Sequence, residues 1–407
     1  MTTDTKTKEG IPRGWKWATL GDIARESSLR NSGAFTHDDL YGVFKGQGLI
    51  PMDDRVKGAG VDRCKVVRPG AFAYNPMRLN IGSIACSELD RDVIVSPDYV
   101  VFETNESTDW RYVNHLRHSD IWTQFVSEAG SGSVRVRIYF KFLKHLSIPL
   151  PPLSEQRRIA EVLGSVDAAI AATESVIAKT RTLKRALLHR LLTRGIGHTE
   201  FKQTEIGQIP ESWGVVNFGD ICNVVRGGSP RPAGDPKYFN GDFIPWLTVK
   251  DVTSQEGIYL LGTHSALTEE GSKQSRILPE GTLVLSNSGA TLGVPKIIGF
   301  ETCANDGIAA FLEIKPTCNK EFAYFFLSTI TEHLRNNVAP GLGQPNLNTS
   351  IIADISLPLP PLSEQNEIVD KIGAIVDDIF ENKKVLNVFH ETKHGLMQDL
   401  LTGKVRV

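Results

Sequence analysis

The chain lacks the cysteine and histidine patterns of disulfide and metal proteins. Its five cysteines are scattered without a Cys-x-x-Cys pair, and its ten histidines show no ligand spacing such as His-Glu-x-x-His. Free thiols in a reducing compartment are expected, and neither a metal nor another cofactor is indicated. No apolar run approaches the roughly 18 residues that span a bilayer, and the polar start lacks a signal-peptide core. We expect a cytoplasmic protein without a membrane partner, with a disordered tail at 1–10.

Charge of neither sign dominates the chain. Lysine and arginine number 45 against 47 aspartate and glutamate, which leaves a formal net charge of −2 at pH 7. This balance argues against a protein that holds nucleic acid mainly by bulk positive charge. Local basic patches, and DNA binding as one subunit of a complex, remain open. With 407 residues the chain is long enough for two cored domains and connecting elements.

Motifs of nucleotide-dependent and methyl-transfer enzymes are missing. No Gly-x-x-x-x-Gly-Lys-Ser/Thr loop exists, and no Gly-x-Gly-x-x-Gly loop follows a strand. The nearest approach to an adenine-methyltransferase loop, Asn75-Pro-Met-Arg78, lacks the second proline and the aromatic residue. Asp306 followed by Glu313-Ile-Lys315 has the order of a metal-dependent nuclease, but the last two charges fit an ordinary exposed strand end. No catalytic residue is therefore expected.

The chain does contain two copies of one phrase. Residues 148–159 read IPLPPLSEQRRI, and residues 357–368 read LPLPPLSEQNEI, 209 positions later. At the same shift ALLHRLLTRG lies over GLMQDLLTGK. The opening IPRGWKWATLGDI from Ile11 recurs as IPESWGVVNFGDI from Ile209, at a shift of 198. Similarity on this scale indicates a duplicated unit rather than a solenoid, whose period is about 20–50 residues. We call the repeated segments the frame and the two dissimilar segments between them the fillings. A chain with one frame and two different fillings is suited to performing the same task on two different targets.

A long helix is predicted after each copy of the phrase. The prolines end a strand, Ser154 and Ser363 stand where N-caps belong, and Glu155 and Glu364 bring negative charge to the helix start. Apolar residues then advance by steps of three and four over about five heptads, which is typical of a coiled coil. Each helix would have about 40 residues, or about 60 Å.

The two helices have two ways to bury their stripes. Each can pack on its own domain, or the two can pair with each other as an antiparallel coiled coil. No other stripe in the chain is equally long, so pairing is the expectation. The positions expected to form the seam or to bind a partner are Ile159, Val166, Ile170, Ile177, Leu187, Ile368, Ile375, Ile379, Phe389 and Leu396.

The fillings are expected to be β-rich. Short runs such as Val93–Phe102, Val134–Phe140 and Ile308–Ile314 are broken by turn residues, and helices fit at Trp110–Glu128 and Lys320–Asn337. The expected fold is mixed α/β, with two β-rich domains separated by the two long helices and related by an internal pseudo-twofold. The implied boundaries are 1–10 for the tail, 11–150 and 206–357 for the two domains, 151–196 for the first helix, and 358–407 for the second helix with a C-terminal tail.

With these features the chain resembles the specificity subunit of a type I restriction–modification system. The duplicated PLPPLSEQ phrase with its heptad helix carries the resemblance, together with the stretch from Arg226-Gly-Gly-Ser-Pro-Arg231 to Ile244-Pro-Trp-Leu-Thr-Val-Lys-Asp251. The resemblance implies two target-recognition domains, each reading half of a bipartite, gapped site in double-stranded DNA. It also implies that the coiled coil sets the spacing and docks two methyltransferase subunits, that two motor–nuclease subunits can join, and that the chain is non-catalytic. DNA methylation and phage defence would be the biological roles.

Residues that can read bases or grip phosphate are concentrated in a few loops. Arginine suits guanine, asparagine suits adenine, and lysine or arginine holds the backbone. The first domain lacks the Gly-Gly-Ser-Pro-Arg loop of the second, and its candidates come from the Tyr74-to-Arg78 loop and the run after Val134. The DNA-binding candidates are Asn75, Arg78, Arg135, Arg137, Tyr139, Lys141, Ser229, Arg231, Lys237, Tyr238, Lys250, Asn287 and Asn346. Two other classes stay open: an enzyme with its own active site, and a coiled-coil adaptor without nucleic-acid contact.

Overall fold

The computed structural model describes residues 10–52, 60–129, 137–338 and 346–407. Contacts group the chain into a first unit of Met1–Glu174 with Lys384–Val407, and a second unit of Ser175–Lys383. Each unit therefore holds one filling, the start of one long helix and the end of the other. This grouping differs from the predicted domains, which stay a prediction. Most of the predicted tail, and Arg135, lie outside the described residues.

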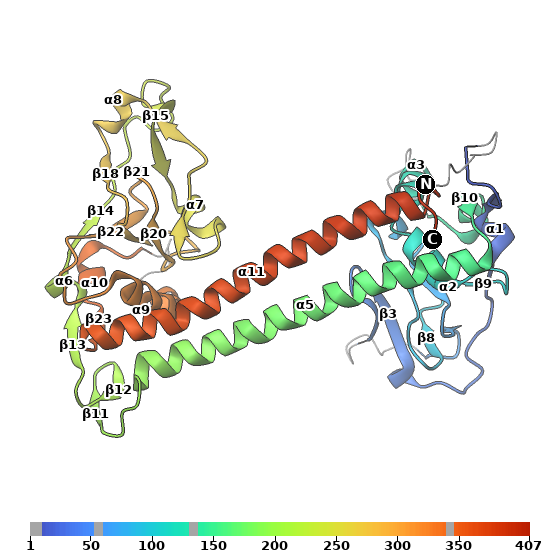
Figure 1. The fold of residues 1–407 in the computed structure, drawn as a ribbon, viewed down its shortest axis with the longest axis horizontal. Helices are drawn as coiled ribbons and strands as arrows, with labels where there is room; N and C mark the ends of the chain where they lie inside the picture. The colour runs from blue at the N-terminus through green and yellow to red at the C-terminus, as the bar shows by residue number, and fades with distance from the viewer. Residues whose placement is uncertain (1–9, 53–59, 130–136, 339–345) are drawn as a thin grey trace. The chain divides into compact units, whose positions relative to one another are not determined.

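The first unit is built on two sheets, with strand orders β2-β9-β6-β7 and β4-β3-β8-β5. Figure 1 labels β3, β8 and β9 among these strands. Phe72 and Phe102 stack at the centre of its core with ring centroids 4.8 Å apart. The strands are β2 (Ala24–Glu26), β3 (Leu40–Phe44), β4 (Gly48–Pro51), β5 (Lys65–Val67), β6 (Phe72–Tyr74), β7 (Ile84–Cys86), β8 (Val93–Val95) and β9 (Val100–Thr104). The helices are α1 (Leu20–Ile23), η1 (His37–Asp39), η3 (Leu79–Ile81), α2 (Trp110–Leu116), α3 (Asp120–Ala129) and α4 (Phe140–Leu143).

The second unit repeats this plan with one additional strand in the first sheet, in the orders β14-β22-β19-β20-β16 and β17-β15-β21-β18. A two-stranded sheet of β11 (Phe201–Thr204) and β12 (Gly207–Pro210) precedes them. The sheet strands are β14 (Asn223–Arg226), β15 (Phe239–Leu247), β16 (Tyr259–Leu260), β17 (Ala266–Leu267), β18 (Arg276–Leu278), β19 (Leu283–Ser286), β20 (Pro295–Ile298), β21 (Thr302–Ala304) and β22 (Ile308–Leu312). The helices are α6 (Phe218–Ile221), α7 (Val249–Ser254), α8 (Glu269–Ser272), α9 (Lys320–His333), the π-helical η4 (Leu334–Val338) and α10 (Thr349–Ala353).

A short strand pair closes each filling. In the first unit β1 (Lys16–Thr19) runs antiparallel to β10 (Ser147–Leu150), and in the second β13 (Gly214–Asn217) runs antiparallel to β23 (Ser356–Leu359). Pro149 lies inside β10 opposite Trp17, so this proline does not end the strand as predicted. A two-stranded pair leaves each strand an open edge, where proline is tolerated. The two repeated phrases thus meet across each filling.

The glutamate and glutamine of the repeated phrase fix the helix starts to the fillings. Glu155 accepts a 3.0 Å hydrogen bond from the Trp15 indole, and Glu364 accepts one of the same length from Trp213. Both tryptophans belong to the repeated opening phrase, and both are buried. Pairing each tryptophan with a glutamate of the distant phrase explains why the two phrases recur together.

The glutamine that follows acts on the backbone of the same filling. The side chain of Gln156 accepts from the N–H of Asp109 at 2.9 Å, just before α2, and that of Gln365 accepts from the N–H of Asn319 at 2.7 Å, just before α9. Both glutamines are buried, and their amide groups also donate to backbone carbonyls. A buried amide with all of these partners resists replacement, because each unmade hydrogen bond costs about 1–3 kcal/mol.

The two long helices are α5 (Leu153–Arg194) and α11 (Leu362–Leu400). Within the first unit the start of α5 packs with the end of α11, since Ile159 and Leu163 share a core with Leu400. Within the second unit Leu191 shares a core with Ile368, so the opposite halves pair there. Both pairings are antiparallel, and the mixed α/β prediction with paired long helices is confirmed.

The predicted seam positions face inward to different degrees. Ile159, Ile170, Ile177 and Ile368 are buried, while the partly buried positions are Val166, Leu187, Ile375, Ile379, Phe389 and Leu396. The prediction that Ser154 and Ser363 cap these helices is wrong. Each helix already begins at the leucine before the serine, and the N–H of Glu155 donates to the Pro152 carbonyl at 2.9 Å. The proline is compatible with this place, because the first helical turn has no internal partner for its N–H groups.

Three of the predicted local elements differ from the structure. Val93–Phe102 forms two strands, β8 and β9, separated by a turn at residues 96–99. The helix predicted at Trp110–Glu128 breaks into α2 and α3. The described part of the Val134–Phe140 run is not a strand, because Tyr139 already precedes α4. Among the described residues, every helix is too short or too polar to span a bilayer.

Candidate nucleic-acid interface

One backbone hydrogen bond joins two polar loops in each unit. In the first unit the N–H of Ile138 donates to the Pro76 carbonyl at 2.9 Å, and in the second the N–H of Leu347 donates to the Asn287 carbonyl at 2.8 Å. Ile138 and Leu347 are both buried. Each apolar side chain therefore pins its loop to the core.

The residues beside these buried side chains face outward. Arg137 and Tyr139 flank Ile138 and are exposed, and Asn346 and Asn348 flank Leu347 and are exposed. Each unit thus joins two loops by one backbone hydrogen bond and places different polar side chains beside it. Asn348 is committed to structure, because its side chain accepts from the N–H of Ile351 at 2.8 Å at the start of α10.

The structure brings the described first-unit candidates into one neighbourhood. The Asn75-to-Arg78 loop lies beside the Arg137-to-Tyr139 segment through the Pro76 hydrogen bond. Asn75 accepts from the N–H of Met77 at 2.9 Å, which holds the loop, while Arg78 is exposed. Arg137 approaches the Tyr139 hydroxyl at 3.5 Å, and Lys141 follows on the exposed side of α4.

In the second unit two arginines share one carboxylate. Asp306 lies between β21 and β22 and accepts a 2.7 Å hydrogen bond from the Ser229 hydroxyl. The Nη2 atoms of Arg231 and Arg226 lie 3.5 and 3.8 Å from its Oδ2. Arg226 also donates from Nε to the Asp306 carbonyl at 2.6 Å. Both guanidiniums are at least half exposed, so their free N–H groups remain available to a ligand.

The electrostatics of this cluster favour an anionic ligand. The Ser229 hydrogen bond, followed by the nearby charges of Arg226 and Arg231, lowers the pKa of Asp306. One ionised carboxylate faces two guanidiniums, which leaves net positive charge at the surface. A metal-dependent nuclease would require the opposite balance, with carboxylates converging on a cation. The arrangement is suited to phosphate or a guanine edge.

The Asp306 turn also meets two other candidate loops. A Cβ added to Gly307 would lie 2.7 Å from Val249 Cγ2 and 2.9 Å from Ser288 Oγ, so the turn requires glycine to approach both. Lys250 follows Val249 on α7 and is exposed. Ser288 pairs with Asn346 through an isolated β-bridge.

Lys237 and Tyr238 are held together, with the ammonium 5.5 Å from the ring centroid. Thr268 donates hydrogen bonds to both of their carbonyls, and both of their N–H groups donate to Asp235. Asn287 is 1% exposed, and neither polar atom of its side chain has a hydrogen-bond partner among the residues that the structure describes. A base contact by Asn287 therefore requires its loop to open.

Three residues of this surface were missed in the sequence. Arg226 and Arg276 were not singled out as contacts, although Arg276 donates to the Arg226 carbonyl at 2.8 Å and is exposed. Asp306 was considered only as part of a nuclease pattern. The Gly-Gly-Ser-Pro sequence indicated a loop at this place. The sequence around the loop does not show that the loop contacts Asp306.

Residues 74–180 and 210–387 match the sequence family described as the type I restriction modification DNA specificity domain. The two segments cover more than half of the chain. The chain belongs to this family. It is a type I DNA specificity subunit, a non-catalytic DNA-recognition component of a restriction–modification system, as the resemblance implied.

Relatives of this type I specificity subunit match it over different lengths. It is 28% identical to the type I restriction enzyme MjaVIII specificity subunit of Methanocaldococcus jannaschii, over 98% of this chain and 94% of that protein. It is 34% identical to the MjaIX specificity subunit of the same organism, over 46% of this chain and 43% of that protein. The second match therefore spans less than half of either chain.

A solved structure shares the fold. It comes from work on complex assembly and conformational transition of the type I R-M system, and the match has a TM-score of 0.60 at 19% identity. It covers 97% of this chain and 99% of that chain. At this identity the likeness extends to the fold alone.

Proposed function

We propose that each unit of this specificity subunit reads one half of a bipartite, gapped site in double-stranded DNA. The observation that carries the proposal is the pair of equivalent loops, joined by the Ile138 and Leu347 hydrogen bonds and bearing different side chains. In the first unit the reading surface would comprise Asn75, Arg78, Arg137, Tyr139 and Lys141. In the second it would comprise Ser229, Arg231, Lys250 and Asn346, with Arg226 and Arg276 added.

The paired helices would set the spacing of the two half-sites. Each runs through both units as one continuous element, so a change of helix length would change the gap between the halves. At about 1.5 Å per residue, each helix of about 40 residues is about 60 Å long, comparable to almost two turns of B-DNA at about 34 Å each. A helix pair of this length allows the two units to contact separate segments of the major groove.

The helices would also dock two methyltransferase subunits, and two motor–nuclease subunits would join the same complex. Support comes from apolar side chains that the helix pairing leaves exposed. Val176 and Leu183 lie one heptad apart on α5 and are 44% and 56% exposed, and Val385 and Val388 on α11 are 45% and 57% exposed. Apolar groups repeated along a polar helix are typical of a surface that a partner covers.

The proposal is tested by selecting bound duplexes from a random library with the co-purified methyltransferase complex. Arg78→Ala should relax the recognised sequence in one half, and Arg231→Ala in the other half only. A base contact contributes about 1–3 kcal/mol of discrimination, whereas loss of a phosphate contact weakens all sequences alike. Lys16→Ala, on the frame strand β1, serves as the control and should leave both halves unchanged. Loss of discrimination in both halves with either variant would rule out separate reading.

A further inference from the structure

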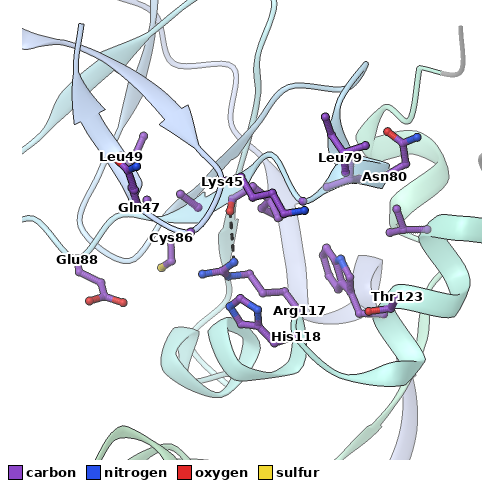
Figure 2. A pocket seen from close by; sticks show the side chains of 18 of the residues that line it. Lys45, Gln47, Leu49, Leu79, Asn80, Cys86, Glu88, Arg117, His118 and Thr123 are labelled. Carbon is purple, nitrogen blue, oxygen red and sulfur yellow. Dashed lines mark hydrogen bonds between the residues drawn. The ribbon is translucent and has the colours of Figure 1, made fainter. Parts of the chain in front are cut away.

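The first unit contains a cavity of about 750 Å³ that DNA recognition by the exposed loops leaves unused (Figure 2). Its walls come from the turn between β3 and β4, the η3 segment, β7 and the α2–α3 helices. A volume of this size is within the range of small-molecule sites, about 300–1,000 Å³. Leu79, Trp122 and Val126 form an apolar part of the wall, and all three are buried.

A guanidinium that makes no salt bridge with the described residues forms part of this wall. Arg117 donates from Nε to Asn114 at 2.7 Å and from Nη1 to the Ile84 carbonyl at 3.3 Å, and Figure 2 shows the second bond. Among the described residues it makes no salt bridge, and no hydrogen bond uses its Nη2. Desolvation lowers the pKa of Arg117, because burial disfavours its charged form. A partly buried charge of this kind is stabilised by an opposite charge.

A second cation lines the same cavity. Lys45 lies on the turn between β3 and β4, and its Cε is 3.7 Å from where a Cβ of Gly82 would stand. Within the described part of the chain its ammonium has no ion-pair partner. Glu88 also lines the cavity, but it already accepts a hydrogen bond from Asn114 at 3.1 Å. The cavity is therefore lined by two cations that make no salt bridge with the described residues, and by one carboxylate, Glu88, whose charge also acts on Arg117.

The remaining polar groups are neutral hydrogen-bonding groups. Gln47 and Asn80 supply amides, and both are exposed to solvent. His118 lines the cavity, and desolvation with the neighbouring Arg117 lowers its pKa to about 3, so its ring is neutral at physiological pH. Amides and a neutral imidazole can donate to and accept from a heterocyclic edge.

We propose that this cavity binds a single nucleotide. The phosphate would lie between Arg117 and Lys45, and the base would lie against the apolar wall near Trp122 with its polar edge toward Asn80 or Gln47. A nucleotide combines the required features, since it is anionic at one end and planar and apolar on its faces at the other. The nucleotide can come from solution or be extruded from bound DNA, and both sources present the same chemistry.

The first experiment titrates the purified full-length chain with AMP, adenosine and inorganic phosphate by calorimetry. If the pocket takes a free nucleotide, AMP should bind at least about tenfold more tightly than adenosine or phosphate, because a charge-assisted contact is worth about 10- to 100-fold. Lys45→Met should weaken AMP binding about tenfold. Lys16→Met removes an exposed charge elsewhere in the same unit and should have no effect. Equal binding of AMP and adenosine would overturn the assignment of an anionic ligand.

A steric variant keeps the test independent of Arg117, whose replacement also removes two structural hydrogen bonds. Thr123 lies on an exposed part of α3 and lines the cavity, whereas Gln124, the next residue, is exposed and does not. Thr123→Trp should fill the cavity and abolish nucleotide binding. Gln124→Trp should preserve it. If both variants bind AMP like the unmodified chain, the ligand is elsewhere and the proposal is wrong.

The second experiment distinguishes the two sources of the nucleotide. Binding of the chain with its methyltransferase is compared on a duplex and on the same duplex carrying one unpaired nucleotide. For an extruded nucleotide, the unpaired base should strengthen binding, and Thr123→Trp should remove that gain while leaving the paired duplex unaffected. Absence of both AMP binding and this gain would overturn the proposal. Binding to the paired duplex reports separately on the proposed DNA recognition.

Discussion

Trp15 donates its indole N–H to Oε2 of Glu155 at 3.0 Å, across 140 positions of the sequence. The same carboxylate accepts hydrogen bonds from the Nε and Nη2 atoms of Arg406 at 2.9 and 2.7 Å. One buried glutamate thus joins the opening phrase, the start of α5 and the C-terminal segment. In the second unit Glu364 takes this part, accepting from Trp213, from the N–H of Ile196 and from His198.

Replacing either glutamate should destabilise its own unit. Glu155→Ala leaves the Trp15 indole without its acceptor and weakens the hold on Arg406, at a cost of about 2–3 kcal/mol. Glu364→Ala should cost a similar amount in the second unit. Hydrogen exchange followed by mass spectrometry should show faster exchange in the affected unit only.

Glu174→Ala is the matched control for this pair, because Glu174 is exposed on α5. Its removal should change the free energy of unfolding measured by hydrogen exchange by less than about 0.5 kcal/mol, as is usual for surface substitutions. Equal protection in all three variants would contradict the role assigned to Glu155 and Glu364.

Asp306 should act as a positioning residue for the two arginines of the second unit. Asp306→Ala removes the shared carboxylate and the acceptor of Ser229, so discrimination at the second half-site should fall about tenfold. Binding to random DNA should be unchanged or stronger, because one negative charge is lost at the surface. Competition binding with native and scrambled half-sites measures both quantities.

Asp242→Ala controls for the change in net charge, since Asp242 is exposed in the same unit. It should leave the discrimination intact. A uniform loss on specific and random DNA with Asp306→Ala would instead mean that the turn has lost its fold.

His115 should make the first unit sensitive to acid. Burial lowers the pKa of His115 to about 4, although Asp167 at 3.7 Å favours the charged form. In the unfolded chain the pKa of His115 is 6.5. The contribution of neutral His115 to the free energy of unfolding is therefore full above pH 6.5 and is lost as the pH falls towards 4. Between pH 7 and pH 5 the free energy of unfolding of the first unit should fall by about 1–2 kcal/mol more in the unmodified chain than in the His115→Gln variant. Urea unfolding at both pH values measures the difference, and identical losses would contradict the prediction.

Charges in the helix seam should break the helix pairing. Ile170 is 8% exposed and Ile379 is partly buried, and an unpaired buried charge costs several kcal/mol. The Ile170→Asp, Ile379→Asp double variant should lose co-purification with the methyltransferase, while the sheets of both units stay protected from exchange. Ala171→Asp with Ala374→Asp adds the same charges at exposed positions of the two helices and should assemble normally. Assembly of the seam variant would show that the helices do not carry the docking.

The long helices could be predicted because their signal is local and repeated. A heptad stripe from Ile159 onwards marks a buried face whatever covers it. The helix start was placed wrongly at Ser154, because a proline just before the first turn and a serine N-cap give almost the same local pattern. The strand predicted at Val134–Phe140 was also wrong at Arg137 to Tyr139, where exposed residues flank the buried Ile138 without a strand. Alternate side chains can be buried in any extended segment, whether or not that segment pairs with another strand through hydrogen bonds.

The candidate site depends on contacts that no local pattern contains. Arg226 meets Asp306 across 80 positions, and Trp15 meets Glu155 across 140. The sequence marks the loop with Ser229 and Arg231 by its glycines and proline. It does not reveal which distant turn supplies the carboxylate, because that pairing is set by the order of strands in the sheet.

The central claim is that this specificity subunit directs modification to a bipartite site, with one half read by each unit. Sequencing of methylated positions should be carried out on genomes of the host with the intact gene, with the gene deleted, and with Arg231→Ala. The account predicts one gapped methylated motif that disappears on deletion and changes in one half only with Arg231→Ala. A methylation pattern unaffected by the deletion, or a change in both halves with the single variant, would contradict it.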